Sequence, residues 1–123
     1  MTEDCIFCKI ATGRIPAEFV AESPTVVAFR DINAAAPTHL LLIPKDHVAD
    51  SAAQLTTQHS EMLGELFELA ARLADEEALN DGWRLVSNVG PAAGQTVHHL
   101  HFHLLGGWSS KDGASRLADE AGG

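Results

Sequence analysis

The segment from Val97 to Leu105 alternates histidines with apolar residues, and this alternation constrains the fold more than any other part of the sequence. Successive side chains of a β-strand point to opposite faces. A strand over 97–105 therefore places His99, His101 and His103 on one face, about 6.6 Å apart at a rise of roughly 3.3 Å per residue. A row of imidazoles is costly to bury without partners, so the pattern indicates chemistry and not core packing. His98 has the opposite parity, and we expect no role for it.

The strongest helical pattern covers residues 57–79. Its apolar side chains fall on one stripe, formed by Met62, Leu66, Leu69, Ala70 and Leu73. Asn80-Asp81-Gly82 is predicted to end this helix in a left-handed turn. A shorter helix is predicted over 5–12, ended by Gly13, with Ile6, Phe7 and Ile10 on one apolar side.

Short apolar runs predict further strands over 25–29, 39–43 and 83–87, in addition to 97–105. Because the strands flank one major helix and follow each other closely after it, we expect an α+β fold with a mostly antiparallel sheet. The 123 residues suit one domain. We predict a catalytic domain over 1–108 and a polar tail over 109–123 that is mobile unless a partner subunit holds it.

Composition excludes several classes of protein. The net charge of −9 argues against binding long nucleic acid, which needs a basic surface. It allows a mononucleotide, because a few backbone N–H groups and histidines can hold one phosphate. No apolar run approaches the roughly 20 residues that span a bilayer, and the chain starts with acids where a secretory signal has bases. We therefore expect no membrane association and a cytoplasmic location.

Two patterns suggest a metal. Cys5 and Cys8 form a C-x-x-C pair, which in a reducing cytosol favours half of a zinc site over a disulfide. The alternative is two small cysteines packed under the short helix. The histidine run offers a different metal hypothesis, in which two alternate imidazoles chelate a catalytic zinc. No acidic residue lies nearby on the same strand, so a further ligand would have to come from elsewhere.

The run His99–Leu105 resembles the H-φ-H-φ-H-φ-φ signature of the histidine triad family, where φ is apolar. Four other stretches resemble the same family in the same order: Cys5–Ile10, Ala28–Ile32, Pro37–Lys45 and Gly94–Val97. Gly106-Gly107 after the run is similar to the Hint branch of this family, the purine nucleoside phosphoramidate hydrolases. The resemblance extends from Cys5 to about Trp108, and it implies a HIT-like fold and a homodimer.

The resemblance also implies catalytic roles. The middle histidine of the triad, His101, would attack the α-phosphorus of a purine nucleotide and carry the nucleotidyl group covalently. An imidazole suits this task because it is a nucleophile at neutral pH and then a good leaving group. Its other ring nitrogen would donate to the carbonyl of His99. His103 and His39 would contact the phosphate, and the Thr96 hydroxyl would assist the leaving group.

A second set of residues would bind the substrate by the same resemblance. Phe29 and Ile32 would lie against the base, and Asp31 would accept from the ribose hydroxyls. Gly94 and Gln95 would lie near the phosphates, and Asn88 near the phosphate and the ribose. Taken alone, Asp31 and Asn88 are better interpreted as turn residues, and the alternative for His39 is an exposed histidine at a strand start. The ordered family match favours the binding roles.

The family resemblance completes the zinc site as well. It implies that Cys5 and Cys8 bind a structural Zn²⁺ together with His47 and His99, outside the chemistry. The leading functional hypothesis is a nucleoside phosphoramidate hydrolase that releases AMP or GMP from an amine, with no organic cofactor. The alternatives are a dinucleoside polyphosphate hydrolase and a zinc-stabilised nucleotide-binding or interaction protein with little turnover. The sequence leaves the choice between adenine and guanine open.

Overall fold

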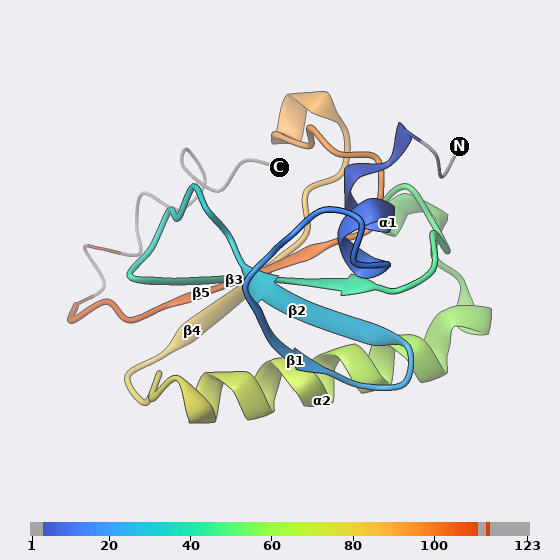
Figure 1. The fold of residues 1–123 in the computed structure, drawn as a ribbon. Helices are drawn as coiled ribbons and strands as arrows, with labels where there is room; N and C mark the ends of the chain where they lie inside the picture. Colours follow the sequence, from blue (N-terminus) through green and yellow to red (C-terminus); the bar gives the residue numbers. More distant parts are fainter. Residues whose placement is uncertain (1–3, 111–112, 114–123) are drawn as a thin grey trace.

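The computed structural model describes residues 4–110 and 113, which are organised around a five-stranded antiparallel sheet (Figure 1). The strands lie in the order β1-β2-β3-β5-β4, and each pairs antiparallel with its neighbours. Their bounds are β1 Phe19–Glu22, β2 Val26–Arg30, β3 Thr38–Pro44, β4 Trp83–Val86 and β5 Phe102–Gly106. The predicted α+β fold with an antiparallel sheet and one major helix is confirmed.

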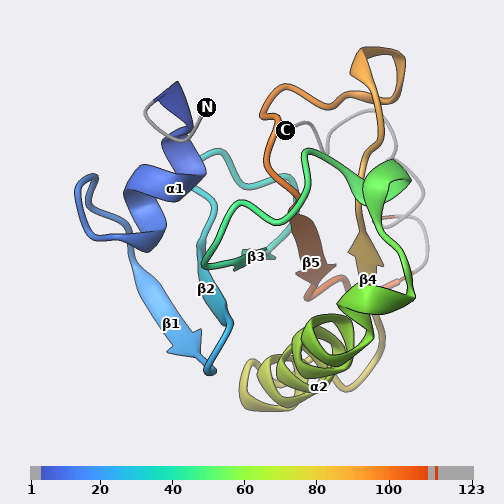
Figure 2. The same ribbon diagram turned by 90° about the vertical axis from the view of Figure 1, so that its right-hand side faces the viewer.

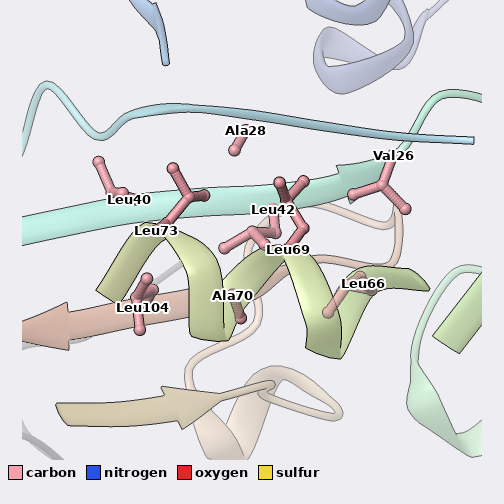
Figure 3. Close-up of a cluster of buried hydrophobic side chains, with 9 residues drawn as sticks. All are labelled: Val26, Ala28, Leu40, Leu42, Leu66, Leu69, Ala70, Leu73 and Leu104. Atoms are coloured by element: carbon pink, nitrogen blue, oxygen red, sulfur yellow. The ribbon is translucent and has the colours of Figure 1, made fainter. Parts of the chain in front are cut away.

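The main helix, α2 (Ser60–Glu76), covers one face of the sheet, and the short helix α1 (Ile6–Ala11) lies over the other face (Figure 2). The predicted stripe is confirmed, since its central members are buried against β2, β3 and β5. Figure 3 shows these side chains between α2 and the sheet: Leu66, Leu69, Ala70 and Leu73 with Val26, Ala28, Leu40, Leu42 and Leu104. Met62 packs at the edge of this cluster.

A second apolar cluster lies on the α1 face of the sheet. Phe7 and Ile10 of α1 pack there with Val27, Phe29, Leu41 and Ile43 of β2 and β3. β3 is therefore buried on both faces, which explains its uninterrupted apolar sequence. His103 of β5 pairs in register with Leu41 and shares its face. The histidine face predicted from alternation is thus the face that α1 covers.

The strand predicted over 97–105 forms only from Phe102 onward. Upstream, the backbone groups bond outside the sheet ladder. The Leu100 N–H donates to the Ala49 carbonyl, and the Ser87 hydroxyl donates to the His101 carbonyl. The prediction of a continuous strand was wrong for 97–101, because loop and side-chain partners replace a neighbouring strand there.

The end of the main helix also differs from the prediction. Residues 57–59 form a separate 3₁₀ turn, and α2 ends at Glu76, before Asn80-Asp81-Gly82. The left-handed residue is Ala78, with φ 59°. The Ala78 N–H donates to the Asp75 carbonyl and the Leu79 N–H to the Ala74 carbonyl, a Schellman ending that turns Leu79 into the core.

Strand β1 was not predicted from the sequence. It is a four-residue edge strand with half-exposed side chains and an irregular register against β2, so it carries no clear alternation. The predicted mobile tail falls mostly outside the described residues. Within the described part of the chain, no helix is long and apolar enough to cross a membrane.

Candidate active site

A cavity of about 460 Å³ opens on the α1 face of the sheet. It is lined by seven of the residues that the sequence nominated: Phe29, Asp31, Ile32, His39, Thr96, His101 and His103. The sequence reasoning missed the opposite wall, which Ile6, Phe7 and Ile10 of α1 and residues 15–17 supply. The signal for it was present, since these α1 residues form the apolar side of the predicted short helix.

His101 is held in one tautomer. Its Nδ1 lies 2.7 Å from the His99 carbonyl, which can only accept, so Nδ1 carries the proton. Its Nε2 has no hydrogen-bond partner among the described residues and therefore presents a lone pair. The Phe7 ring packs edge-on against the imidazole, with centroids 4.9 Å apart. The side chain is thus fixed with one nitrogen uncommitted at the cavity wall.

His39 and His103 form a bonded pair beside it. His39 Nε2 lies 2.8 Å from His103 Nδ1, and His39 Nδ1 accepts the Ala35 N–H at 2.9 Å. Burial lowers the pKa of His103 to about 4, with a further lowering by His101 and His39. Burial also lowers the pKa of His39, against an opposing effect of Asp31. Both rings are therefore neutral at pH 7.

The predicted sugar and base residues line the same cavity as this pair. Asp31 Oδ1 accepts the Asn33 N–H at 2.8 Å, and Oδ2 lies 3.4 Å from His39 Nε2. Phe29 is buried and contacts Phe7 edge-to-face. Ile32 is 94% exposed at the rim, although it is a large apolar residue. An apolar side chain held in water at a cavity mouth is suited to cover a planar ligand.

A second cluster, formed by Cys5, Cys8, His47 and His99, lies beside the cavity. Its four ligand atoms all lie within 4.8 Å of one another. The distances from sulfur to Nδ1 are 3.2 Å for Cys5–His99, 3.5 Å for Cys8–His99 and 3.6 Å for Cys8–His47. A tetrahedral ion with bonds of about 2.3 Å to sulfur and about 2.0 Å to nitrogen separates these atoms by about 3.5 Å. The donor geometry therefore fits a metal ion.

The hydrogen bonds of the two imidazoles and the pKa of Cys8 also fit a metal ion in this cluster. His99 Nε2 donates to the Pro44 carbonyl at 3.0 Å, and His47 Nε2 donates to Asp50 Oδ1 at 2.6 Å, so both Nδ1 lone pairs face the sulfurs. Burial and the adjacent Cys5 thiol raise the pKa of Cys8 to about 11. Two thiolates cannot share this site without a cation, so the four residues could hold a metal ion.

Comparisons with known proteins agree with this geometry. The family model described as "Scavenger mRNA decapping enzyme C-term binding" matches residues 4–117. A solved HIT family hydrolase from Clostridium thermocellum superimposes with a TM-score of 0.83 and 41% identity, covering 87% of this chain and 93% of that one. The chain belongs to the histidine triad (HIT) family. The enzyme class predicted from the sequence, a HIT-type hydrolase, is confirmed.

Two curated relatives cover most of this HIT chain. It is 41% identical over 108 residues to the purine nucleoside phosphoramidase of Escherichia coli (strain K12), across 87% of this chain and 90% of that protein. It is 49% identical over 105 residues to the 14 kDa zinc-binding protein of Zea mays, across 83% of this chain and 80% of that protein.

Three predicted phosphate residues of the HIT site lie in the loop beside the cavity and not among its lining residues. Gln95 is buried, accepts the Gly90 N–H and donates to the carbonyls of Asp50 and Val97. Gly94 is left-handed, with φ 95°, and a Cβ there would lie 3.7 Å from Asn88 Nδ2. In this structure the Gln95 side chain braces the loop that carries Thr96. Phosphate contacts by these three residues remain a prediction.

Proposed function

We propose that this HIT protein is a purine nucleoside phosphoramidate hydrolase that works through a covalent nucleotidyl intermediate on His101. The observation that carries the proposal is the state of His101. Its Nδ1–H is held by the His99 carbonyl, and its Nε2 has no partner in the described part of the chain, at the wall of a nucleotide-sized cavity. The name of the Escherichia coli relative supports the class of substrate.

The cavity divides into an apolar half and a polar half. The purine lies against the apolar wall that Phe29 and the α1 residues Phe7 and Ile10 line, and Ile32 covers it at the rim. Asp31 accepts from the ribose hydroxyls. The α-phosphate then lies at the histidines, where His103 offers an N–H to a phosphate oxygen. Aromatic and aliphatic walls supply the burial that a base needs, and few polar groups fix its orientation.

In the first step, the Nε2 lone pair of His101 attacks the α-phosphorus. The P–N bond to the amine breaks, its electron pair goes to the amine nitrogen, and that nitrogen takes up a proton from solvent. Thr96 lines the same cavity as His101, and in this proposal its hydroxyl assists the proton transfer to the departing amine.

In the second step, water attacks the same phosphorus. The P–Nε2 bond breaks, its electron pair returns to His101, and the water proton is released to solvent, leaving AMP or GMP. Division into two displacements replaces one difficult step by two easier ones, because imidazole serves as nucleophile and then as leaving group.

We further propose that Cys5, Cys8, His47 and His99 bind a structural Zn²⁺. A closed set of two thiolates and two imidazoles leaves no coordination position for substrate. The name of the maize relative, a zinc-binding protein, supports the identity of the metal. When bound, zinc would link α1 to the loop after β3 and to the triad segment, while the residues of the cavity perform the chemistry.

The homodimer and the cytoplasmic location are also proposals. Phe67 on α2 and Trp83 on β4 are 51% and 40% exposed, which is consistent with burial against a second copy. Sedimentation velocity at micromolar concentration should give a dimer, and a monomer would refute this proposal.

The catalytic proposal is tested by trapping the intermediate. A purine phosphoramidate with a labelled α-phosphate is reacted with the enzyme and quenched at high pH, where a phosphoryl-histidine bond survives. Label should appear on His101, disappear on treatment with acid, and be absent in His101→Ala. His98→Ala, which changes the exposed histidine nearby, should label as the wild type does. No labelled protein together with native turnover by His101→Ala would refute the mechanism, and faster turnover of a dinucleoside polyphosphate would change the substrate class.

A further inference from the structure

His39, near the start of β3, has both ring nitrogens engaged inside the protein. Its side chain is only 1% exposed. Nδ1 accepts the Ala35 N–H at 2.9 Å, and a backbone N–H can only donate. A neutral imidazole has one proton, so the proton of His39 sits on Nε2. His39 could contact a substrate phosphate only by giving up one of these bonds.

The proton on His39 Nε2 determines the tautomer of His103. The two nitrogens that join the rings, His39 Nε2 and His103 Nδ1, lie 2.8 Å apart. Because His39 donates, His103 Nδ1 accepts, and the proton of His103 must sit on its Nε2. The lowered pKa values of both rings agree, since neither ring then gains a second proton at pH 7.

Asp31 is the weaker partner of the same His39 nitrogen. Its Oδ2 lies 3.4 Å from Nε2, beyond good hydrogen-bond distance, and its Oδ1 accepts the Asn33 N–H. The shorter bond to His103 is therefore the one that the His39 proton makes.

His101 is held in the opposite tautomer from its neighbour. The His99 carbonyl keeps the His101 proton on Nδ1, so the lone pair is on Nε2. The His101 and His103 rings lie side by side, with centroids 5.1 Å apart. The Nε2 atoms of both rings lack partners within the described residues. The pair therefore presents one lone pair and one N–H donor, which attack on a phosphate requires together.

We propose that His39 is a positioning residue, which holds His103 as an N–H donor and does not itself contact the phosphate. The donation to phosphate rests on the function proposed above, whereas the tautomer assignment does not. Ala35 acts through its backbone N–H at one end of this chain of hydrogen bonds, and His103 Nε2–H is the other end.

Two variants of His39 test its bond to His103 separately from its bond to the Ala35 N–H. His39→Gln places its amide nitrogen where Nε2 lies, so it can still donate to His103. His39→Asn is one methylene shorter and places its amide oxygen near the Nδ1 position, so it can accept from Ala35 but cannot reach His103. His98→Gln is the matched control, because His98 is exposed and outside the cavity wall.

The first readout is the tautomer of His103, measured by long-range ¹H–¹⁵N correlation on the ¹⁵N-labelled protein as purified. The wild type and His39→Gln should show the Nε2–H form, and His39→Asn should show a mixture. The second readout is kinetic. His39→Asn should lower kcat by up to roughly 10², the usual effect of losing one donor to a developing anion, in step with the share of His103 that has lost its Nε2–H, and with a smaller change in KM. His39→Gln should recover most of that loss, and His98→Gln should match the wild type.

An Nδ1–H tautomer of His103 in the wild type would overturn the proposal, and this result needs no variant to fold. Equal kcat losses in His39→Gln and His39→Asn would also overturn it. If the tautomers behave as stated but no nucleotidyl group forms on His101, the proposed function fails while the positioning role of His39 stands.

Discussion

His99 and His101 are two residues apart, and the proposed function gives them different tasks. His99 donates its Nε2–H to the Pro44 carbonyl and turns Nδ1 toward two sulfurs. His101 donates its Nδ1–H to the His99 carbonyl and leaves Nε2 at the cavity wall. The residue type is the same, so the difference lies in which nitrogen the backbone occupies. In the proposed function, a carbonyl at Nε2 leaves Nδ1 of His99 free to bind the metal, and a carbonyl at Nδ1 leaves Nε2 of His101 free to act as the nucleophile.

The two clusters are also physically joined. The ring of His99 belongs to the metal cluster, while its carbonyl fixes the tautomer of His101. Phe7 contacts both rings edge-on, with centroids 5.9 Å from His99 and 4.9 Å from His101. The proposed metal cluster is therefore connected by direct contacts to the proposed catalytic cluster, although in the proposed function it contributes no reacting atom.

Replacement of the nucleophile should give the largest effect. His101→Ala removes the lone pair that would form the proposed covalent bond, so turnover of a purine phosphoramidate should fall by roughly 10³-fold or more. AMP binding, measured by calorimetry, should change far less, because the rest of the cavity stays in place. Turnover within tenfold of the wild type would show that the open site does not depend on His101.

Removal of the Cys5 and Cys8 thiols should abolish metal binding and lower stability without abolishing catalysis. Cys5→Ser with Cys8→Ser should abolish zinc in metal analysis and lower the free energy of unfolding by about 2–4 kcal/mol, or roughly 10 °C in Tm. Activity should decrease but remain measurable, because the cavity histidines are unchanged. A native protein purified without zinc, or a folded double variant without any turnover, would contradict this division.

Acid should destabilise the protein partly through His103. In the unfolded chain this side chain takes up a proton near its ordinary pKa of about 6.5, whereas in the folded state its pKa is about 4. The unfolded state therefore binds more protons between these values, and stability is lost as the pH falls from about 6.5 to about 4. Protonation of His103 can lower the free energy of unfolding by at most about 3 kcal/mol over this range.

His103→Gln isolates this contribution, because the variant cannot titrate there. In urea denaturation at pH 7 and pH 4.5, the wild type should lose more stability than His103→Gln, since the metal ligands are common to both. If the wild type and His103→Gln lose the same unfolding free energy between the two pH values, His103 is not held neutral by burial.

The smallest effect concerns the rim of the open site. Ile32→Ala should raise the KM for a purine phosphoramidate by roughly fivefold, the loss of about 1 kcal/mol of apolar contact. Its Tm should not change, because the side chain is 94% exposed in the free protein. Val89→Ala, another exposed aliphatic truncation, should change neither quantity.

Periodicity predicted the layers of this molecule well. The stripe from Met62 to Leu73 identified the buried face of α2, and the parity of His103 identified the face that α1 covers. Alternation failed over 97–101, because it cannot reveal that Ala49 takes the Leu100 N–H in place of a neighbouring strand. β1 escaped prediction because an irregular edge strand leaves no pattern.

The site residues were largely nominated by the family resemblance, but their roles depend on contacts that only the fold shows. No sequence pattern shows that the Ala35 N–H occupies His39 Nδ1, or that the three bonds of Gln95 all go to the backbone. Both contacts join residues through loops, where spacing does not determine geometry.

The central claim is that the backbone partner of the second nitrogen assigns each histidine its task. It is tested most directly by the tautomers of His99 and His101 in the ¹⁵N-labelled wild-type protein, read from long-range ¹H–¹⁵N correlations. The account predicts an Nε2–H tautomer for His99 and an Nδ1–H tautomer for His101 in the same spectrum. The same tautomer for both residues, or an Nε2–H form of His101, would contradict it.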